Sequence, residues 1–160
     1  ITDNMFRFWY RFVPENTSII CRGAADLAYK RIAPELPAYM DGVFEEICRQ
    51  YLWKLLLENK CAVNFGDLGR WWGTNPRTRV REEIDIMGAD KGTALFAACQ
   101  WTNEKIDPGI LETLVERSNL FDYKQKHFYL FAKTGFTREC IDRADEMGNV
   151  TLVAYHEMLL

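Results

Sequence analysis

The sequence contains few of the residues that build zinc sites and disulfide frameworks. It has only two histidines, His127 and His156, and its five cysteines are odd in number, scattered and never spaced as a CxxC pair. Zinc sites and disulfide-stabilised domains need paired residues at short, regular spacing. We therefore expect no zinc site, reduced thiols and a cytoplasmic location.

Three further motifs are absent, and each absence argues against a class of protein. No run of about 18 apolar residues occurs, which predicts no transmembrane helix and no membrane partner. No basic segment followed by an apolar one marks a signal peptide. No GxxxxGK(S/T) loop occurs, so we expect no ATP binding by that route.

The chain also lacks a large excess of charge of either sign. Its formal net charge is −3, so any binding of phosphate groups must come from a local basic patch. A hydrophobic content of 48% in 160 residues is typical of one globular domain with a substantial core. The sequence begins with Ile1 rather than Met and stops at Leu160 inside an apolar run, so we expect a fragment of a longer protein.

The spacing of apolar residues predicts both helices and strands. Helical spacing predicts helices at residues 4–13, 24–32 and 38–58. Pro14 is expected to end the first of these helices. Asp107 and Thr137 have the position of N-caps, which predicts two more helices directly after them. Alternating or short apolar runs predict strands at 65–73, 81–87, 93–101, 126–133 and 149–159, with a turn at 88–92.

This order of elements predicts an α/β fold. One helix, three strands and two helix–strand pairs follow one another, in the order α-β-β-β-α-β-α-β. An antiparallel hairpin system that continues into β-α-β crossovers produces a mixed central sheet with helices on both faces. We therefore predict a three-layer α/β/α domain over residues 36–160. Residues 1–35 are predicted to be an N-terminal helical linker segment packed on that domain.

Acidic residues on the second predicted strand suggest a catalytic site. Polar and apolar residues alternate there, which predicts Arg81, Glu83 and Asp85 on one face and Ile84 and Ile86 on the other. A magnesium site for phosphodiester cleavage combines such an Asp with an acid on the next strand and a Lys two residues further on, on the same face. A glutamate from a preceding helix often completes the site.

Four short motifs give the chain a resemblance to a known family. FEEIC on the long helix and WWG, EIDI and ACQW on the three following strands together resemble the C-terminal domain of prokaryotic, archaeal-type AAA ATPases. The resemblance implies a domain of unknown function with a restriction-endonuclease-like fold of the PD-(D/E)xK type. The opening FRFWYRFV resembles the segment that joins this domain to a winged-helix part. The implied partners are therefore the ATPase and winged-helix parts of the same longer chain.

The resemblance also assigns positions in the site. It matches Glu45 to the acid on the helix and Asp85 to the metal-binding aspartate. The third motif of the family reads Glu-Cys-Lys-Trp, whereas this chain has Ala98 in place of the glutamate and Gln100 in place of the lysine. The departure removes a metal ligand and a cation, which implies weak or absent metal binding by Asp85 and Glu45. We expect no strongly bound cofactor.

Two hypotheses about function concern this site. The first is a degenerate, non-catalytic nuclease-like module that serves nucleic-acid binding, partner docking or regulation. The second is an active Mg²⁺- or Mn²⁺-dependent DNA phosphodiesterase with a rearranged site. In that case Glu83 or Glu45 would join Asp85 in holding the metal, and Gln100 would position the attacking water.

Simple surface chemistry offers another explanation for both acids. Glu45 lies four residues before Arg49, so an ion pair on one flank of a helix accounts for it. Asp85 can face Arg81 or a neighbouring strand as an ordinary hairpin charge.

Two groups of residues near the hairpin bear on the choice of partner. Arg77, Arg79 and Arg81 are expected to share one strand face, either as a ladder that contacts phosphates of DNA or as the charged edge of a surface hairpin. Trp71 and Trp72 are expected on opposite faces of their strand. One ring then enters the core, and the other is free to stack on a partner or on a base.

A third hypothesis is a module that only binds other proteins. It predicts an exposed apolar patch, which we expect around Phe6, Trp9 and Phe12.

Overall fold

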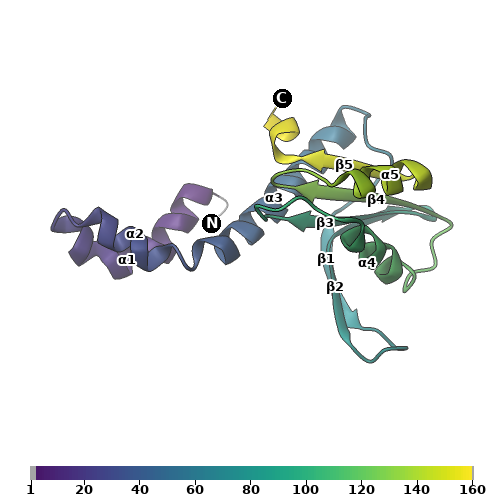
Figure 1. Ribbon diagram of the computed structural model, residues 1–160. Coiled ribbons are helices and arrows are strands. Elements are labelled where there is room, and N and C mark those ends of the chain that lie inside the picture. The colour runs from purple at the N-terminus through teal and green to yellow at the C-terminus, as the bar shows by residue number, and fades with distance from the viewer. Residues whose placement is uncertain (1–2, 160) are drawn as a thin grey trace. The chain divides into compact units, whose positions relative to one another are not determined.

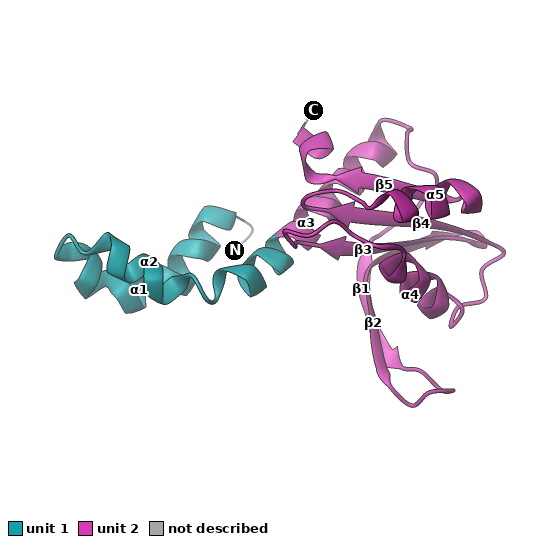
Figure 2. Ribbon diagram, viewed as in Figure 1, with its two compact units in different colours: residues 1–43 teal, residues 44–160 magenta. Residues whose placement is uncertain are grey.

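The chain, seen in a computed structural model, divides into two compact units. The structure describes residues 3–159, so Ile1 and Leu160, the two ends named above, lie outside it. Unit 1 covers residues 1–43 and unit 2 covers residues 44–160 (Figure 2). Helix α3, Leu36–Leu57, crosses the boundary between the units, whereas we predicted a boundary before this helix. The packing of the N-terminal segment on the domain stays a prediction.

Unit 1 consists of α1 (Asn4–Cys21), α2 (Ala25–Ile32) and the first part of α3. Phe12 is only 3% exposed, because its ring packs against those of Phe8 and Tyr39, at centroid distances of 5.1 and 5.3 Å. Phe6 and Trp9 are 59% and 47% exposed. The apolar patch predicted in the first helix therefore contains Phe6 and Trp9, and including Phe12 was wrong.

The first helix does not end at Pro14, as we predicted, but continues to Cys21. A proline inside a helix removes one backbone N–H and so one hydrogen bond of the ladder. Two polar side chains in the next turn donate hydrogen bonds back to the helix. Asn16 donates to the carbonyl of Phe12 at 2.8 Å, and Thr17 donates to that of Val13 at 3.0 Å. These bonds reinforce the turn that contains the proline.

Unit 2 is built on a five-stranded sheet. Its elements are β1 (Gly69–Thr74), β2 (Arg81–Asp90), β3 (Thr93–Gln100), α4 (Pro108–Ser118), β4 (Gln125–Ala132), α5 (Arg138–Met147), β5 (Val150–Ala154) and the 3₁₀ helix η1 (Tyr155–Leu159). The strands lie in the order β1-β2-β3-β4-β5 (Figure 1). The pairs β1–β2 and β2–β3 are antiparallel, and β3–β4 and β4–β5 are parallel. Across residues 3–159, no helix combines the length and the apolar character needed to cross a membrane.

Two separate hydrophobic cores cover the two faces of the sheet. On one face, Phe44 of α3 packs in a cluster with Leu95 of β3. On the other face, Leu111 of α4 and Cys140 of α5 pack in a cluster with Phe96, the next residue of β3. Successive residues of a strand point to opposite faces, so β3 contributes to both cores. The predicted three-layer α/β/α domain with a mixed central sheet is thus confirmed.

The two crossover helices begin where their capping residues predict. The Asp107 side chain accepts a hydrogen bond from the N–H of Gly109 at 2.8 Å, and the Thr137 hydroxyl accepts one from the N–H of Cys140 at 3.2 Å. These bonds satisfy backbone donors that have no partner inside the helix. α5 ends at Gly148, whose φ of 70° is the left-handed conformation that glycine adopts readily.

Three strand boundaries differ from the prediction by three or more residues. β1 begins at Gly69 rather than at residue 65. The predicted turn at 88–92 is wrong in extent, because β2 continues to Asp90. The turn itself needs only Lys91 and Gly92, whose φ values of 46° and 86° suit a two-residue hairpin loop. The last strand stops at Ala154 rather than 159. There the Glu157 side chain accepts a hydrogen bond from the Ala154 N–H, and the chain continues as η1.

We predict that Gly88→Ala destabilises unit 2. A Cβ at this position would lie 2.7 Å from Leu68 Cδ2, 3.0 Å from the carbonyl oxygen of Asp67 and 3.1 Å from Phe65 Cβ. Overpacking of this kind costs about 1–3 kcal/mol of the free energy of unfolding, measurable by urea denaturation. Gly69→Ala is the matched control, because a Cβ there meets nothing within 4 Å. Equal stability of the two variants would contradict this account.

Candidate functional site

Strand β2 carries an irregularity at Asp85. Along the β1–β2 pair, Trp71 lies opposite Ile84 but Gly69 lies opposite Met87, so β2 has one residue more than β1 over this stretch. Such a β-bulge interrupts the alternation of side chains between the two faces. Ile84 accordingly belongs to the core under α4 and α5, and Ile86 belongs to the core under α3. Our prediction that Ile84 and Ile86 share one face was therefore wrong.

The side chain of Asp85 bonds to the backbone of the neighbouring strand. The regular pairing of β2 with β3 begins at Ile86 and Ala97. Next to it, the Asp85 carboxylate oxygen Oδ2 accepts a hydrogen bond from the Cys99 N–H at 2.8 Å. Burial raises the pKa of Asp85, although the bond from Cys99 and the charge of Arg70 act in the opposite direction. This carboxyl group is therefore part of the connection between β2 and β3.

A second acid lies within electrostatic reach of Asp85. Glu45 on α3 has a pKa raised by burial, and the charge of Asp85 raises that pKa further, while Arg70 and Arg49 oppose the shift. Arg49 Nη2 lies 2.8 Å from Glu45 Oε1, so the predicted helix-flank ion pair is confirmed. Arg70 of β1 approaches the other oxygen of Glu45 at 3.7 Å.

Arg70 also pairs with the third acid of the site. Its Nη2 lies 2.8 Å from Glu83 Oε2. The guanidinium therefore lies between an acid of α3 and an acid of β2. Sequence analysis missed Arg70, because nothing in the local pattern indicates that it faces Glu45.

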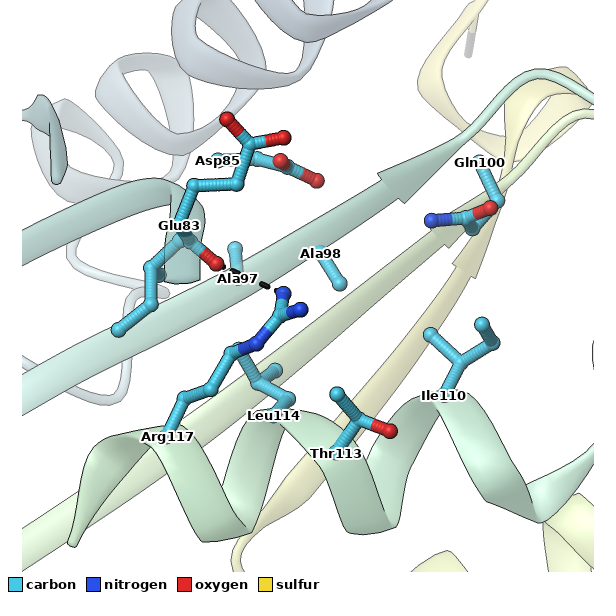
Figure 3. A pocket seen from close by; sticks show the side chains of 10 residues that line it. Glu83, Asp85, Ala97, Ala98, Gln100, Ile110, Thr113, Leu114 and Arg117 are labelled. Atoms are coloured by element: carbon cyan, nitrogen blue, oxygen red, sulfur yellow. Dashed lines mark hydrogen bonds between the residues drawn. The ribbon is translucent and has the colours of Figure 1, made fainter. Parts of the chain in front are cut away.

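A cavity of about 220 Å³ opens beside Asp85 on the side of the sheet that carries α4 (Figure 3). The residues that line it are Glu83, Ile84, Asp85, Ala97, Ala98, Gln100, Ile110, Thr113, Leu114 and Arg117. The cavity therefore brings together Asp85, Ala98 and Gln100, as the motif comparison implied. Glu45 is not among its lining residues. The catalytic and metal-binding roles assigned to these positions stay predictions.

Arg117 enters this cavity from the last turn of α4. Its Nη1 donates a hydrogen bond to the backbone carbonyl of Glu83 at 2.7 Å, and Figure 3 shows the guanidinium beside Ala98. Its charge also lowers the pKa of Asp85. Sequence analysis missed Arg117, although its spacing from Ile110 and Leu114 follows the inward face of the helix.

The donor groups of the site do not fit a strong magnesium site. Mg²⁺ needs near-octahedral oxygen ligands, usually with one or two carboxylates. Within residues 3–159 no group of three His, Cys, Asp or Glu side chains is placed to hold a metal ion. Ala98 offers no ligand, and Arg70 and Arg117 supply positive charge around Asp85. A divalent ion would have to compete with these guanidinium groups for the same carboxylates.

The three arginines predicted as a ladder lie at the tip of the β1–β2 hairpin. Only Arg81 belongs to a strand, where it is the first residue of β2, while Arg77 and Arg79 lie in the connecting loop. Arg79 has a φ of 57°, which is incompatible with a strand. The prediction that they share one strand face was therefore wrong. All three are exposed, and none forms an ion pair within the described part of the chain.

The order of the strands and the two crossovers define an α/β domain with a mixed five-stranded sheet, and an acid lies at the bulge of its second strand. The chain belongs to the family DUF234, described as archaeal and bacterial proteins of unknown function, which it matches over residues 9–111. It is 31% identical over 107 residues to an uncharacterized protein of Methanocaldococcus jannaschii. The match covers 66% of this chain and 23% of that protein, so the chain spans about a quarter of its relative.

Two solved structures are similar to this chain at low sequence identity. A protein of unknown function, AF1548, has a TM-score of 0.44 and 17% identity, over 68% of this chain and 58% of its own. The restriction endonuclease MspJI in complex with a 27-mer oligonucleotide has a TM-score of 0.45 and 12% identity, over 84% of this chain and 30% of its own.

We predict opposite effects for two substitutions of Asp85. Because burial raises its pKa, the folded protein disfavours the carboxylate, and stability is lost as the pH rises from about 4, the pKa of Asp in unfolded chains. Asp85→Asn removes this loss and keeps an acceptor for Cys99, so it should stabilise the protein at pH 7. Asp85→Ala leaves a backbone N–H without its partner and should cost about 1–3 kcal/mol.

The check is denaturant unfolding of the wild type and both variants between pH 3 and pH 8. The advantage of Asp85→Asn should shrink as the pH falls, since the wild-type side chain then becomes protonated. A loss of stability in Asp85→Asn equal to that in Asp85→Ala at pH 7 would refute the assignment.

Proposed function

We propose that this domain is a degenerate nuclease-like module of a longer AAA-type ATPase, and that it binds nucleic acid without cleaving it. The observation that supports this proposal best is the charge balance of the site. Glu45 and Glu83 form ion pairs with guanidinium groups, and the charges of two guanidinium groups lower the pKa of Asp85.

The chemistry of phosphodiester cleavage explains why this balance matters. In metal-dependent nucleases, carboxylates keep their negative charge free for a divalent ion, which activates water and stabilises the charge of the transition state. Here Arg70 contacts both Glu45 and Glu83, and Arg117 lies beside Asp85. With Ala98 in place of a ligand, the acids are used for internal ion pairing.

The association with an ATPase rests on the FEEIC, WWG, EIDI and ACQW motifs. It agrees with the length of the M. jannaschii relative, of which this chain matches 23%. The proposal of nucleic-acid binding rests on Arg77, Arg79 and Arg81. They are exposed and form no ion pair within residues 3–159, so their guanidinium groups are suited to phosphate contacts.

We predict that Mg²⁺ or Mn²⁺ changes neither the melting temperature of the protein nor the integrity of a supercoiled plasmid. The ion is added at about 5 mM, a concentration on the order of the dissociation constants of the weakest protein sites for divalent ions. The physical reason is the arginine-neutralised acid cluster around Asp85. Thermal unfolding and agarose-gel electrophoresis provide the two measurements. Plasmid cleavage by the wild type that is abolished by Asp85→Ala would instead establish an active phosphodiesterase.

A reconstruction of the lost site tests the same reasoning in the opposite direction. We predict that Ala98→Glu with Gln100→Lys binds Mn²⁺ weakly, because the new carboxylate meets the Arg117 guanidinium in the cavity. Adding Arg117→Met removes that cation while keeping most of its volume, and should tighten Mn²⁺ binding at least about tenfold, the effect of one charge-assisted contact of about 1.4 kcal/mol.

Isothermal titration calorimetry with MnCl₂ measures both variants, and Arg117→Met alone is the matched control. Equal affinity in the double and triple variants would show that Arg117 does not compete with a metal ion.

A further inference from the structure

We infer that the outer part of the β1–β2 hairpin is a binding surface for single-stranded nucleic acid. In this surface Trp72 stacks on a base, and Arg77, Arg79 and Arg81 contact the phosphates. The inference rests on the proposed function and adds to it the class of nucleic acid and the residues that select it. In Figure 1 the tip of this hairpin extends away from α4 and from the other strands of unit 2.

The two adjacent tryptophans of β1 have different environments. Trp71 packs edge-on against the ring of Phe121 at 5.2 Å and belongs to the core under α4 and α5. Its ring also covers Gly73, where a Cβ would lie 2.6 Å from the ring. Trp72 is 61% exposed and contacts no other ring within the described residues. One of the two rings therefore remains available to a partner.

The register of the hairpin places Trp72 beside an arginine. Trp72 lies opposite Glu83, and Thr74 lies opposite Arg81. Residues opposite each other, and residues two apart on a strand, share a face, so Trp72 and Arg81 project from the same face of the hairpin. The acid on this face, Glu83, is paired with Arg70 at 2.8 Å. No unpaired carboxylate of β1 or β2 therefore lies between Trp72 and the arginines on this face.

The loop that carries the other arginines is held in one conformation by Asn75. This side chain is only 6% exposed. Its oxygen accepts a hydrogen bond from the Arg77 N–H at 2.9 Å, and its amide donates to Glu82 at 3.0 Å. The Asn75 backbone bonds to Val80 at 2.9 Å and to Arg79 at 2.8 Å. An ordered loop loses less conformational entropy when it binds a ligand, and the backbone that carries the arginines is already ordered before binding.

This combination favours a single strand over a duplex and over a protein. Exposed aromatic rings bind bases by their flat faces, and these faces are accessible only where the bases are unpaired. A duplex would engage the arginines through its phosphates and leave Trp72 without a role. Seven residues from Asn75 to Arg81 include three arginines and no acid, in a chain of net charge −3. The positive charge of this tip therefore complements the negative charge of a polyanion.

The test uses the whole chain in EDTA, with fluorescence anisotropy of labelled 20-nucleotide oligothymidylate, oligouridylate and a 20-base-pair duplex. Trp72→Ala should lower affinity for the single strands about 5- to 100-fold and leave duplex affinity unchanged, whereas Trp72→Phe should retain most of it. Tyr29→Ala, at an exposed aromatic of unit 1, is the matched control. The two single strands distinguish DNA from RNA.

The arginines are tested by the salt dependence of binding. Each of Arg77→Gln and Arg79→Gln should reduce the slope of log affinity against log salt by about 0.7 for a single strand. Arg138→Gln on α5 is the control, since this arginine is paired with Asp142.

The possible failures are distinguishable. Binding to both forms of DNA that is insensitive to Trp72→Ala would overturn the single-strand surface and leave the proposed function in place. No salt-dependent binding to any of the three probes would overturn both, and would favour a module that binds only proteins. Thermal unfolding of Trp72→Ala should match the wild type, since the ring is outside the core.

Discussion

The hydrogen bond from the Cys99 N–H to the Asp85 carboxylate is the contact around which the site is organised. It lies where the regular pairing of β2 and β3 starts, next to a bulge in β2. Because of the bulge, Ile84 and Ile86 point into different cores, so β2 is packed on both faces. Asp85 lies between these two packed residues. A buried carboxylate needs compensation for the water it loses. The backbone donor and two nearby guanidinium groups supply part of that compensation, and burial still raises the pKa of Asp85.

The arginines connect the three layers of the domain at this point. Arg49 extends from α3, Arg70 from β1 and Arg117 from α4, and each contacts an acid or a carbonyl near Asp85. In this arrangement the acids Glu45 and Glu83 form internal ion pairs. The base and the tip of the β1–β2 hairpin therefore have different possible roles. Its base belongs to the neutralised site, and its tip carries exposed arginines and Trp72.

The sequence predicted most of the fold. It also predicted that Asp85, Ala98 and Gln100 lie together, but it did not indicate that Arg70 and Arg117 lie beside them. Helix caps such as Asp107 and Thr137 are local signals, and the apolar runs of β3 and β4 indicate buried strands, so these elements were confirmed. The extension of α1 beyond Pro14 was not predicted, because side chains of the following turn compensate the proline. The face of the sheet from which Ile84 projects was predicted wrongly, because the cause again lies outside the strand's own sequence. A bulge is set by the register with β1, which alternation within one strand does not reveal.

By itself, the sequence determined that position 98 offers no carboxylate and position 100 no cation, because Ala98 and Gln100 are fixed by identity wherever the strand lies. It also determined the order of helices and strands, through periodicity and capping. Only the tertiary structure decided which cations lie beside the acids, since Arg70 is 25 residues from Glu45 and Arg117 is 32 residues from Asp85 along the chain. Folding alone brings such distant charges together, because their pairing depends on how the layers of the domain pack on one another.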